Sequence, residues 1–231
     1  MEIRAAVVFE KSAAFSIEQL EMSDPNDNEV LVCISGTGIC HTDIAGQEQY
    51  LPIPPERAFP AVFGHEGAGV VEAVGARVTK VKPGDHVALS WDFCGTCPAC
   101  KSGNEPYCND LFLYNFNGAR PDGTPTLRKG DQIIHGSFFS QSSLANYALA
   151  NERNVVKVSK DIPLEILEIS RHIQAQEAHE KFPQIKNFHL NQDGDAHFPV
   201  EIAGFNYLEM EIATRNEIKQ AICALYGRKS A

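Results

Sequence analysis

Four closely spaced cysteines constrain the fold of this 231-residue chain more than any other feature. Cys94, Cys97, Cys100 and Cys108 lie in the run CGTCPACKSGNEPYC, with the spacing C-x2-C-x2-C-x7-C. Four thiolates on so short a segment can surround one ion, and a tetrahedral all-sulfur site is typical of structural zinc. Glycine and proline alternate with the cysteines, so we expect turns here rather than a helix or a strand. The sequence therefore predicts a lobe that folds around its metal.

Two other interpretations of the four cysteines stay open. The first is a pair of disulfides, or four unrelated thiols. No charged and then apolar leader opens the sequence, however, which favours a cytoplasmic protein, and disulfides are rare in that compartment. The second is an iron–sulfur cluster, which also uses C-x2-C-x2-C. Such clusters usually place the fourth cysteine after three residues and follow it with proline, whereas here seven residues intervene and Asn109 follows.

A second group of metal-binding residue types lies upstream. The run Cys40–Asp43 and the pair His65–Glu66 each place a soft or borderline ligand beside an acid. Two such short motifs can converge on one zinc and leave positions open for water or substrate. They predict a catalytic metal site. Cys33, in an apolar run, has no such neighbours and is expected in the core.

The sequence continues from Gly64 as GHEGAGVVEAVGARVTKVKPGDHV, with glycines at turns and valines suited to strand core. Together with both cysteine motifs and the later runs GSFFSQSSLANYALA and VVKVSKDIPLEIL, it resembles the zinc-containing medium-chain alcohol dehydrogenases. The resemblance extends from Met1 to about Leu167 and is strongest to the aryl or benzyl alcohol branch. It implies a mainly β, GroES-like barrel from which the four-cysteine zinc lobe protrudes.

The expected organisation is a GroES-like catalytic domain at 1–167, followed by a short α/β tail at 168–231. The expected barrel strands are Arg4–Phe9, Ile17–Met22, Val30–Gly36, Gly69–Val74, His86–Ser90, Ala145–Ala150 and Val155–Val158. Around the tail we expect a polar helix over 165–181, short strands at 185–190, 199–203 and 207–213, a turn at 191–195 and a last helix over 214–227. The last helix opens with a capping box and faintly resembles the C-terminal segment of the family's catalytic domain.

The resemblance also implies roles for individual residues. Cys40 and His65 correspond to ligands of the catalytic zinc, and Glu66 corresponds to a neighbouring carboxylate that can approach the metal. Asp43 corresponds to the carboxylate that orients the histidine through its other ring nitrogen.

Further positions follow from the same resemblance. Thr42 corresponds to the hydroxyl that takes up the substrate's proton, with His41 as a further member of that relay. Aligned without a gap from Pro163, His172 falls where the family has a third zinc-ligand cysteine. The residues that correspond to neighbours of the family's alcohol pocket are Tyr50, Leu51, Trp91 and Phe93. The aromatic-rich loop LFLYNFNGARPDG favours an aromatic primary alcohol as substrate.

The family binds NAD or NADP in a dinucleotide-binding domain, for which we find no G-x-G-x-x-G turn between a strand and a helix. The glycine pairs 36/38 and 67/69 belong to the motifs already assigned. We therefore expect an alcohol-activating domain with one structural and one catalytic zinc, without its own nicotinamide site or complete Rossmann domain, and inactive by itself. It would form a homo-oligomer or take a cofactor domain from a partner. The alternative is a zinc-binding GroES-like module without redox turnover, a truncated or repurposed relative of the family.

The composition argues against two classes of partner, nucleic acids and membranes. A net charge of −10 argues against nucleic acid, because neutralising phosphates needs clustered lysine and arginine. No apolar run approaches the roughly 20 residues of a membrane span. The ligand that the family resemblance implies is a small-molecule alcohol.

Overall fold

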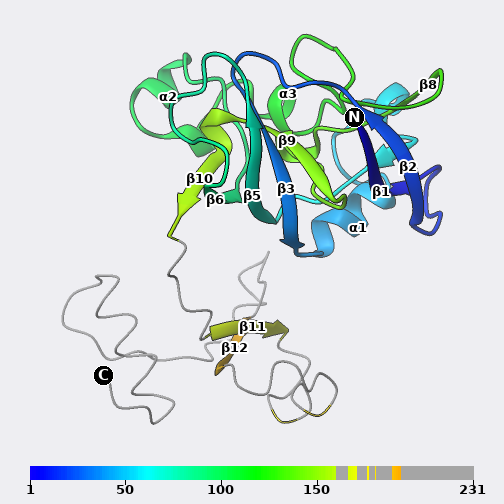
Figure 1. Ribbon diagram of the computed structural model, residues 1–231. Coiled ribbons are helices and arrows are strands. Elements are labelled where there is room, and N and C mark those ends of the chain that lie inside the picture. The colour runs from blue at the N-terminus through cyan, green and yellow to red at the C-terminus, as the bar shows by residue number, and fades with distance from the viewer. Residues whose placement is uncertain (160–165, 171–175, 177–179, 181–188, 194–231) are drawn as a thin grey trace. The chain divides into compact units, whose positions relative to one another are not determined.

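The computed structural model describes residues 1–159, 166–170, 176, 180 and 189–193 (Figure 1). The chain divides into two units, Met1–Lys160 and Asp161–Ala231. Within the described residues the first unit is mainly β, as the sequence predicts. It contains two five-stranded sheets whose neighbouring strands are antiparallel.

The first sheet has the strand order β4-β1-β2-β7-β8. Its strands are β1 Glu2–Val8, β2 Ser16–Met22, β4 Ala61–Val62, β7 Leu127–Lys129 and β8 Gln132–Ile134. Alternation explains β1, in which Ile3, Ala5 and Val7 are buried between more exposed neighbours. The sheet therefore presents one apolar face to the interior.

The second sheet has the order β10-β6-β5-β3-β9. Its strands are β3 Glu29–Thr37, β5 Gly67–Val74, β6 His86–Leu89, β9 Tyr147–Asn151 and β10 Val155–Val158. Figure 1 shows β3, β5 and β9 side by side, with β1 and β2 of the first sheet next to them. All seven strands predicted for the barrel are confirmed, and the short strands β4, β7 and β8 were not predicted.

Strand β3 is buried on both faces. Leu31 packs in the apolar cluster that includes the first sheet, whereas Val30 and Val32 pack in a second cluster with β5 and β9. Both valines have no exposed surface. Full burial of such a side chain stabilises the fold by about 1.5–3 kcal/mol. The apolar run of β3 thus contributes stability to both clusters.

The four-cysteine lobe lies between β6 and β7 in the sequence. It contains the one-turn helix α2 (Pro98–Lys101), the 3-10 helix η2 (Glu105–Tyr107) and helix α3 (Leu111–Asn115). The prediction that the cysteine run forms only turns is wrong at α2, because Pro98 occupies the first helical position, where proline is favourable. The remaining helices are α1 His41–Gln47 and the 3-10 helices η1 Pro55–Arg57, η3 Phe138–Ser140 and η4 Glu152–Asn154.

In the second unit, β11 (Ile166–Ser170) pairs in parallel with β12 (His189–Asp193). The helix predicted over 165–181 is therefore wrong at β11 but holds at Gln176 and Glu180, which are helical. The strand predicted over 185–190 is confirmed at 189 and 190, and the turn predicted after it is wrong at 191–193. Short apolar runs fit both helical and strand spacing, and the distant pairing partner decides. His172 and the elements predicted after residue 194 lie outside the described residues.

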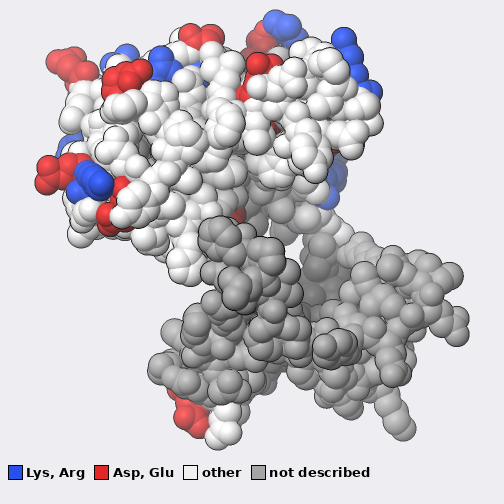
Figure 2. Space-filling model, turned by 180° about the vertical axis from the view of Figure 1, so that it is seen from behind, with Lys and Arg blue, Asp and Glu red and all other residues white. Residues whose placement is uncertain are grey.

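Charged side chains are dispersed on the face shown in Figure 2. Lysine and arginine lie there among aspartate and glutamate, without one continuous basic patch on that face. No helix in the described part of the chain is both long and apolar enough to cross a membrane.

Candidate metal centres

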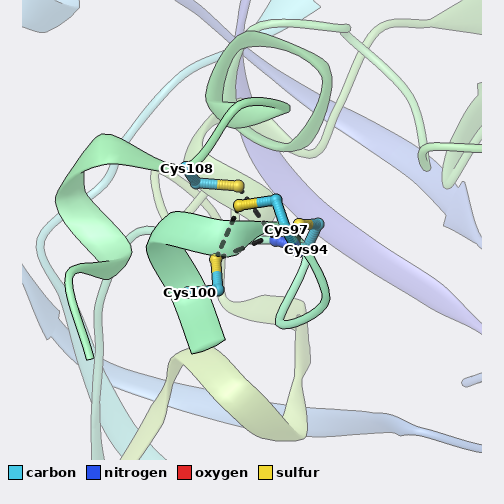
Figure 3. Close-up of side chains that lie close together, drawn as sticks. All are labelled: Cys94, Cys97, Cys100 and Cys108. Atoms are coloured by element: carbon cyan, nitrogen blue, oxygen red, sulfur yellow. Dashed lines mark hydrogen bonds between the residues drawn. The ribbon is translucent and has the colours of Figure 1, made fainter. Parts of the chain in front are cut away.

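The four predicted cysteines meet in one cluster. The ligand atoms of Cys94, Cys97, Cys100 and Cys108 all lie within 4.8 Å of one another, and the side chains point toward a common centre (Figure 3). The Sγ atoms of Cys97 and Cys100 are 3.5 Å apart, and those of Cys94 and Cys100 are 3.9 Å apart. Zinc–sulfur bonds of about 2.3 Å give tetrahedral edges of about 3.8 Å, so the cluster has the size of a zinc site. All four thiols are free.

Electrostatics within this cluster favours a bound cation. Backbone N–H groups of Cys100 and Asn109 lower the pKa of Cys97 to about 6. Burial raises the pKa of Cys100 to about 12. Because neighbouring thiolates repel one another in a buried site, all four ionise together only with a positive ion between them.

Buried polar contacts attach the lobe to the barrel. Asp92 is 2% exposed and accepts two bonds from Arg153, from Nε at 3.0 Å and from Nη2 at 3.1 Å. The same guanidinium lies over the ring of Tyr114, at 5.3 Å. The amide of Asn115 accepts from the backbone N–H of Asp92 at 2.9 Å and donates to its carbonyl at 2.8 Å. The segment before the cysteines is thereby held to helix α3 after them.

The second cluster begins at the start of α1. Cys40 is the N-cap of this helix, and its Sγ accepts from the backbone N–H of Thr42 at 3.3 Å. The backbone N–H of Cys40 donates to Oδ2 of Asp43 at 3.0 Å, which completes a capping box. The cap directs the sulfur toward His65, whose Nε2 lies 3.4 Å from Sγ. An ion bonded to both atoms at ordinary zinc distances would separate them by about 3.5 Å.

The imidazole of His65 is held from several sides. Oδ1 of the fully buried Asp43 lies 3.2 Å from Nδ1 and also accepts from the Gly64 N–H at 2.8 Å. The ring of Phe139 stacks on the imidazole at 4.7 Å, and Phe138 contacts it edge-on at 5.7 Å. Gly64 has φ +96°, and a Cβ there would lie 2.3 Å from the Leu144 nitrogen, so only glycine fits this turn. Nδ1 of the His65 ring thus faces the Asp43 carboxylate, and Nε2 of the same ring faces Sγ of Cys40.

The remaining predicted residues of this cluster lie around it. Oε1 of Glu66 is 3.9 Å from Nε2 of His65, and its side chain is 46% exposed. A Cβ at residue 38 would lie 1.8 Å from Oε2 of Glu66, so Gly38 leaves the space that the carboxylate occupies. His41 and Thr42 follow the N-cap in the first turn of α1, the former exposed and the latter half-buried.

Residues 26–160 match the family described as the alcohol dehydrogenase GroES-like domain. The chain belongs to this family. The geraniol dehydrogenase of Castellaniella defragrans is 42% identical over 165 residues, which are 71% of this chain and 43% of that relative. The family resemblance predicted from the sequence is confirmed.

Two solved structures of alcohol dehydrogenases support the same fold. An alcohol dehydrogenase zinc-binding domain protein from Burkholderia ambifaria has 48% identity and a TM-score of 0.67, covering 71% of this chain and 44% of that chain. The benzyl alcohol dehydrogenase of Acinetobacter calcoaceticus has 45% identity and a TM-score of 0.65, covering 71% and 43%. The GroES-like fold is thus confirmed, and the chain spans less than half the length of these relatives.

The four residues predicted for the alcohol pocket have separate surroundings. Trp91 and Phe93 contact each other with ring centroids 5.7 Å apart, and Phe93 also packs on the four-cysteine cluster. Leu51 packs against the barrel core. Tyr50 is 76% exposed, with Nζ of Lys11 5.6 Å from its ring. The pocket stays a prediction.

Sequence reasoning missed the loop that covers His65. Phe138 and Phe139 contact the His65 ring, and Gln141 donates to the His65 carbonyl. Gln141 lies 76 positions after His65 in the sequence. The sequence signal for this loop was the Ser- and Phe-rich run GSFFSQSS, which lies between two strands and contains neither Asn nor Pro. In the structure, Ser137, Phe139, Ser140 and Ser142 have positive φ.

Proposed function

We propose that this chain is the alcohol-activating domain of a zinc-dependent alcohol dehydrogenase. Cys40 and His65 would hold a catalytic zinc, and the four-cysteine cluster would hold a structural one. The observation that supports this assignment best is the 3.4 Å approach of Cys40 Sγ to His65 Nε2, with Asp43 bonded behind the ring. One thiolate and one neutral imidazole are a donor set that zinc accepts, and they leave positions free for further ligands.

Each residue of the site would have its own role in oxidising the alcohol. Zinc supplies positive charge that favours loss of the alcohol's proton. Asp43 holds His65 in the tautomer with Nδ1–H toward the carboxylate and Nε2 free to bind. The hydroxyl of Thr42 accepts the substrate's proton, and His41 passes it to solvent. A nicotinamide held elsewhere would supply the hydride acceptor, and the product would be an aldehyde or a ketone.

An aromatic primary alcohol is the substrate class that we propose. The support is the 45% identity to a benzyl alcohol dehydrogenase. Tyr50, Leu51, Trp91 and Phe93 would supply apolar walls. Geraniol dehydrogenase, at 42% identity, supports a primary alcohol more broadly.

The nicotinamide would be held by residues other than those of the barrel. Among the described residues, the pair Gly67 and Gly69 lies inside strand β5 rather than in a turn that opens a helix, so it offers no phosphate cradle. A reducing compartment such as the cytoplasm is part of the proposal, because six free thiols are described. The competing function is a zinc-binding module without turnover, which would hold the same metal and oxidise no alcohol.

Metal content tests the assignment directly. Purified protein should hold two zinc ions per chain, and His65→Ala should hold one. His86→Ala, in strand β6, is the matched control and should keep both. If His65→Ala retains all the zinc of the parent protein, the catalytic site is wrongly placed. His172→Ala tests the third ligand, since it should weaken only the site that His65→Ala removes.

A further inference from the structure

Gln141 makes a buried set of hydrogen bonds beside the second metal centre. The residue is only 2% exposed to solvent. Nε2 donates to the His65 carbonyl at 2.9 Å and to the Ser90 carbonyl at 3.1 Å. Oε1 accepts from the backbone N–H of Gly67 at 3.1 Å. One side-chain amide thus binds both peptide groups that flank Glu66.

The geometry resembles pairing between strands. A glutamine amide offers donors and an acceptor side by side, as a backbone peptide group does. Strand β5 begins at Gly67, and Gln141 supplies a partner for the backbone immediately before and at this start. The direction of the His65 ring and of the Glu66 carboxylate depends on this backbone, because each side chain is attached to it.

The loop that contains Gln141 is itself well anchored. Ser142 Oγ donates to the Val62 carbonyl at 2.7 Å and accepts from the Phe138 N–H at 2.9 Å. These bonds hold a segment in which four residues other than glycine have positive φ, a conformation that persists only when surrounding contacts enforce it. The same loop places the Phe139 ring against His65. Contacts to ring and backbone therefore come from one anchored segment.

We propose that Gln141 is a positioning residue of the Cys40–His65 metal centre, fixing the backbone on both sides of Glu66. The metal-binding part rests on the proposed function. The positioning part rests only on the three hydrogen bonds of the amide. The two parts can be tested separately.

The experiment compares Gln141→Met with Asn154→Ala. Methionine keeps the length and volume of the side chain and removes all three hydrogen bonds. Asn154 is the matched control: it is 1% exposed and donates to the same Ser90 carbonyl at 2.9 Å and to the loop carbonyls of Ser140 at 3.3 Å and Phe139 at 3.5 Å. Its substitution therefore removes contacts to Ser90 and to the loop, whereas the hydrogen bonds of Gln141 to residues 65 and 67 stay in place. Gln141→Glu, which keeps an acceptor for Gly67 and loses the amide donors, is the second variant should methionine prevent folding.

The first readout is cobalt binding to metal-free protein, followed by absorption. Four thiolates give stronger sulfur-to-cobalt bands than one, so the two sites are distinguishable. We expect roughly 10- to 100-fold weaker binding at the Cys40–His65 site in both Gln141 variants, the range typical of groups that hold metal ligands. The four-cysteine site should be unchanged, and Asn154→Ala should bind like the parent protein. Parental affinity in the Gln141 variants would overturn the proposal.

The second readout is hydrogen exchange of the Gly67 amide in metal-free protein. It should be at least about tenfold faster in the Gln141 variants and unchanged in Asn154→Ala. If the parent protein binds no cobalt at Cys40 and His65, the proposed function fails, and the exchange rate still decides whether Gln141 fixes this backbone. Equal exchange in parent and variants would refute the positioning role.

Discussion

Asp43 shows how much one residue can organise. It has no exposed surface, and its two oxygens accept from the backbone of Gly64, from Nδ1 of His65 and from the backbone of Cys40. The carboxylate therefore begins helix α1, holds the Gly64 turn and orients the His65 ring. Buried charges are stable only when paired in this way.

Asp43→Asn should weaken the Cys40–His65 site by about 10- to 100-fold, because one amide oxygen cannot accept all three bonds and the NH2 group faces donors. Metal content after dialysis against a weak chelator measures the effect. The four-cysteine site should stay full, and Asp131→Asn, on the exposed surface, should change nothing. A variant that keeps both ions as tightly as the parent would contradict the role of Asp43.

At the scale of elements, the lobe of α2, η2 and α3 has little apolar core of its own. Its described cluster consists of the buried cysteines with Phe93, Cys97, Leu111 and Tyr114 packed around them. The four cysteines thus occupy the place that large apolar side chains take in the barrel. Under the proposed function, zinc binding and folding of the lobe would be coupled.

Cys97→Ser should remove one zinc per chain and lower the melting temperature of the lobe. Serine keeps the size of the side chain but lacks the thiolate that zinc prefers. Cys33→Ser, in strand β3, is the control and should keep all the metal. Unchanged zinc content in Cys97→Ser, measured by elemental analysis, would sink the structural-zinc assignment.

His135 gives the elements around strand β8 a pH dependence. Burial, and in lesser part the charge of Arg57, lowers the pKa of His135 below its ordinary 6.5. Its backbone links two segments, with the N–H donating to Pro60 at 2.7 Å and the carbonyl accepting from Val62 at 2.9 Å. The folded protein therefore prefers the neutral ring. Stability from this preference is present above pH 6.5 and is lost as the pH falls through the lowered pKa.

His135→Gln removes this titration. The free energy of unfolding of the parent protein should fall relative to that of His135→Gln between about pH 7.5 and about pH 5. Urea unfolding at both values measures the difference, with His86→Gln as the control. A gap between parent and His135→Gln that is constant with pH would show that the buried ring does not contribute.

At the scale of the whole molecule, strand β3 of the second sheet packs in both apolar clusters, and both candidate metal centres lie next to the ends of barrel strands. The first follows β6, and the second joins the segments after β3 and before β5. Under the proposed function, zinc alone would favour the alkoxide, whereas oxidation of the alcohol would also need a nicotinamide presented beside the site. Positioning of reactants accounts for about 7–11 kcal/mol of barrier lowering in favourable cases.

The isolated chain should accordingly bind NADH no better than millimolar and oxidise benzyl alcohol no faster than background. NADH fluorescence and the NADH absorbance measure the two quantities with zinc-loaded protein. Turnover by the chain alone would reveal a cofactor site within it. Turnover only after mixing with a full-length relative would indicate a cofactor domain supplied in trans.

The sequence by itself determined the candidate ligand residues and seven of the barrel strands. Cysteines within one short run must meet if they bind one ion, and alternating apolar residues predict strands regardless of what lies opposite. The start of α1 was not predicted, although its cap is local, because Cys40 and Asp43 form it within one turn.

Only the tertiary structure decided what surrounds those ligands. Gln141 reaches His65 across 76 positions, and Arg153 reaches Asp92 across 61. A glutamine or an arginine carries no local signal of such a partner, since either residue is equally stable in solvent. The same reason explains the misassigned strand β11, whose short apolar run fits a helix until β12 lies beside it. Contacts between distant segments depend on chain topology, and no spacing along the chain encodes them.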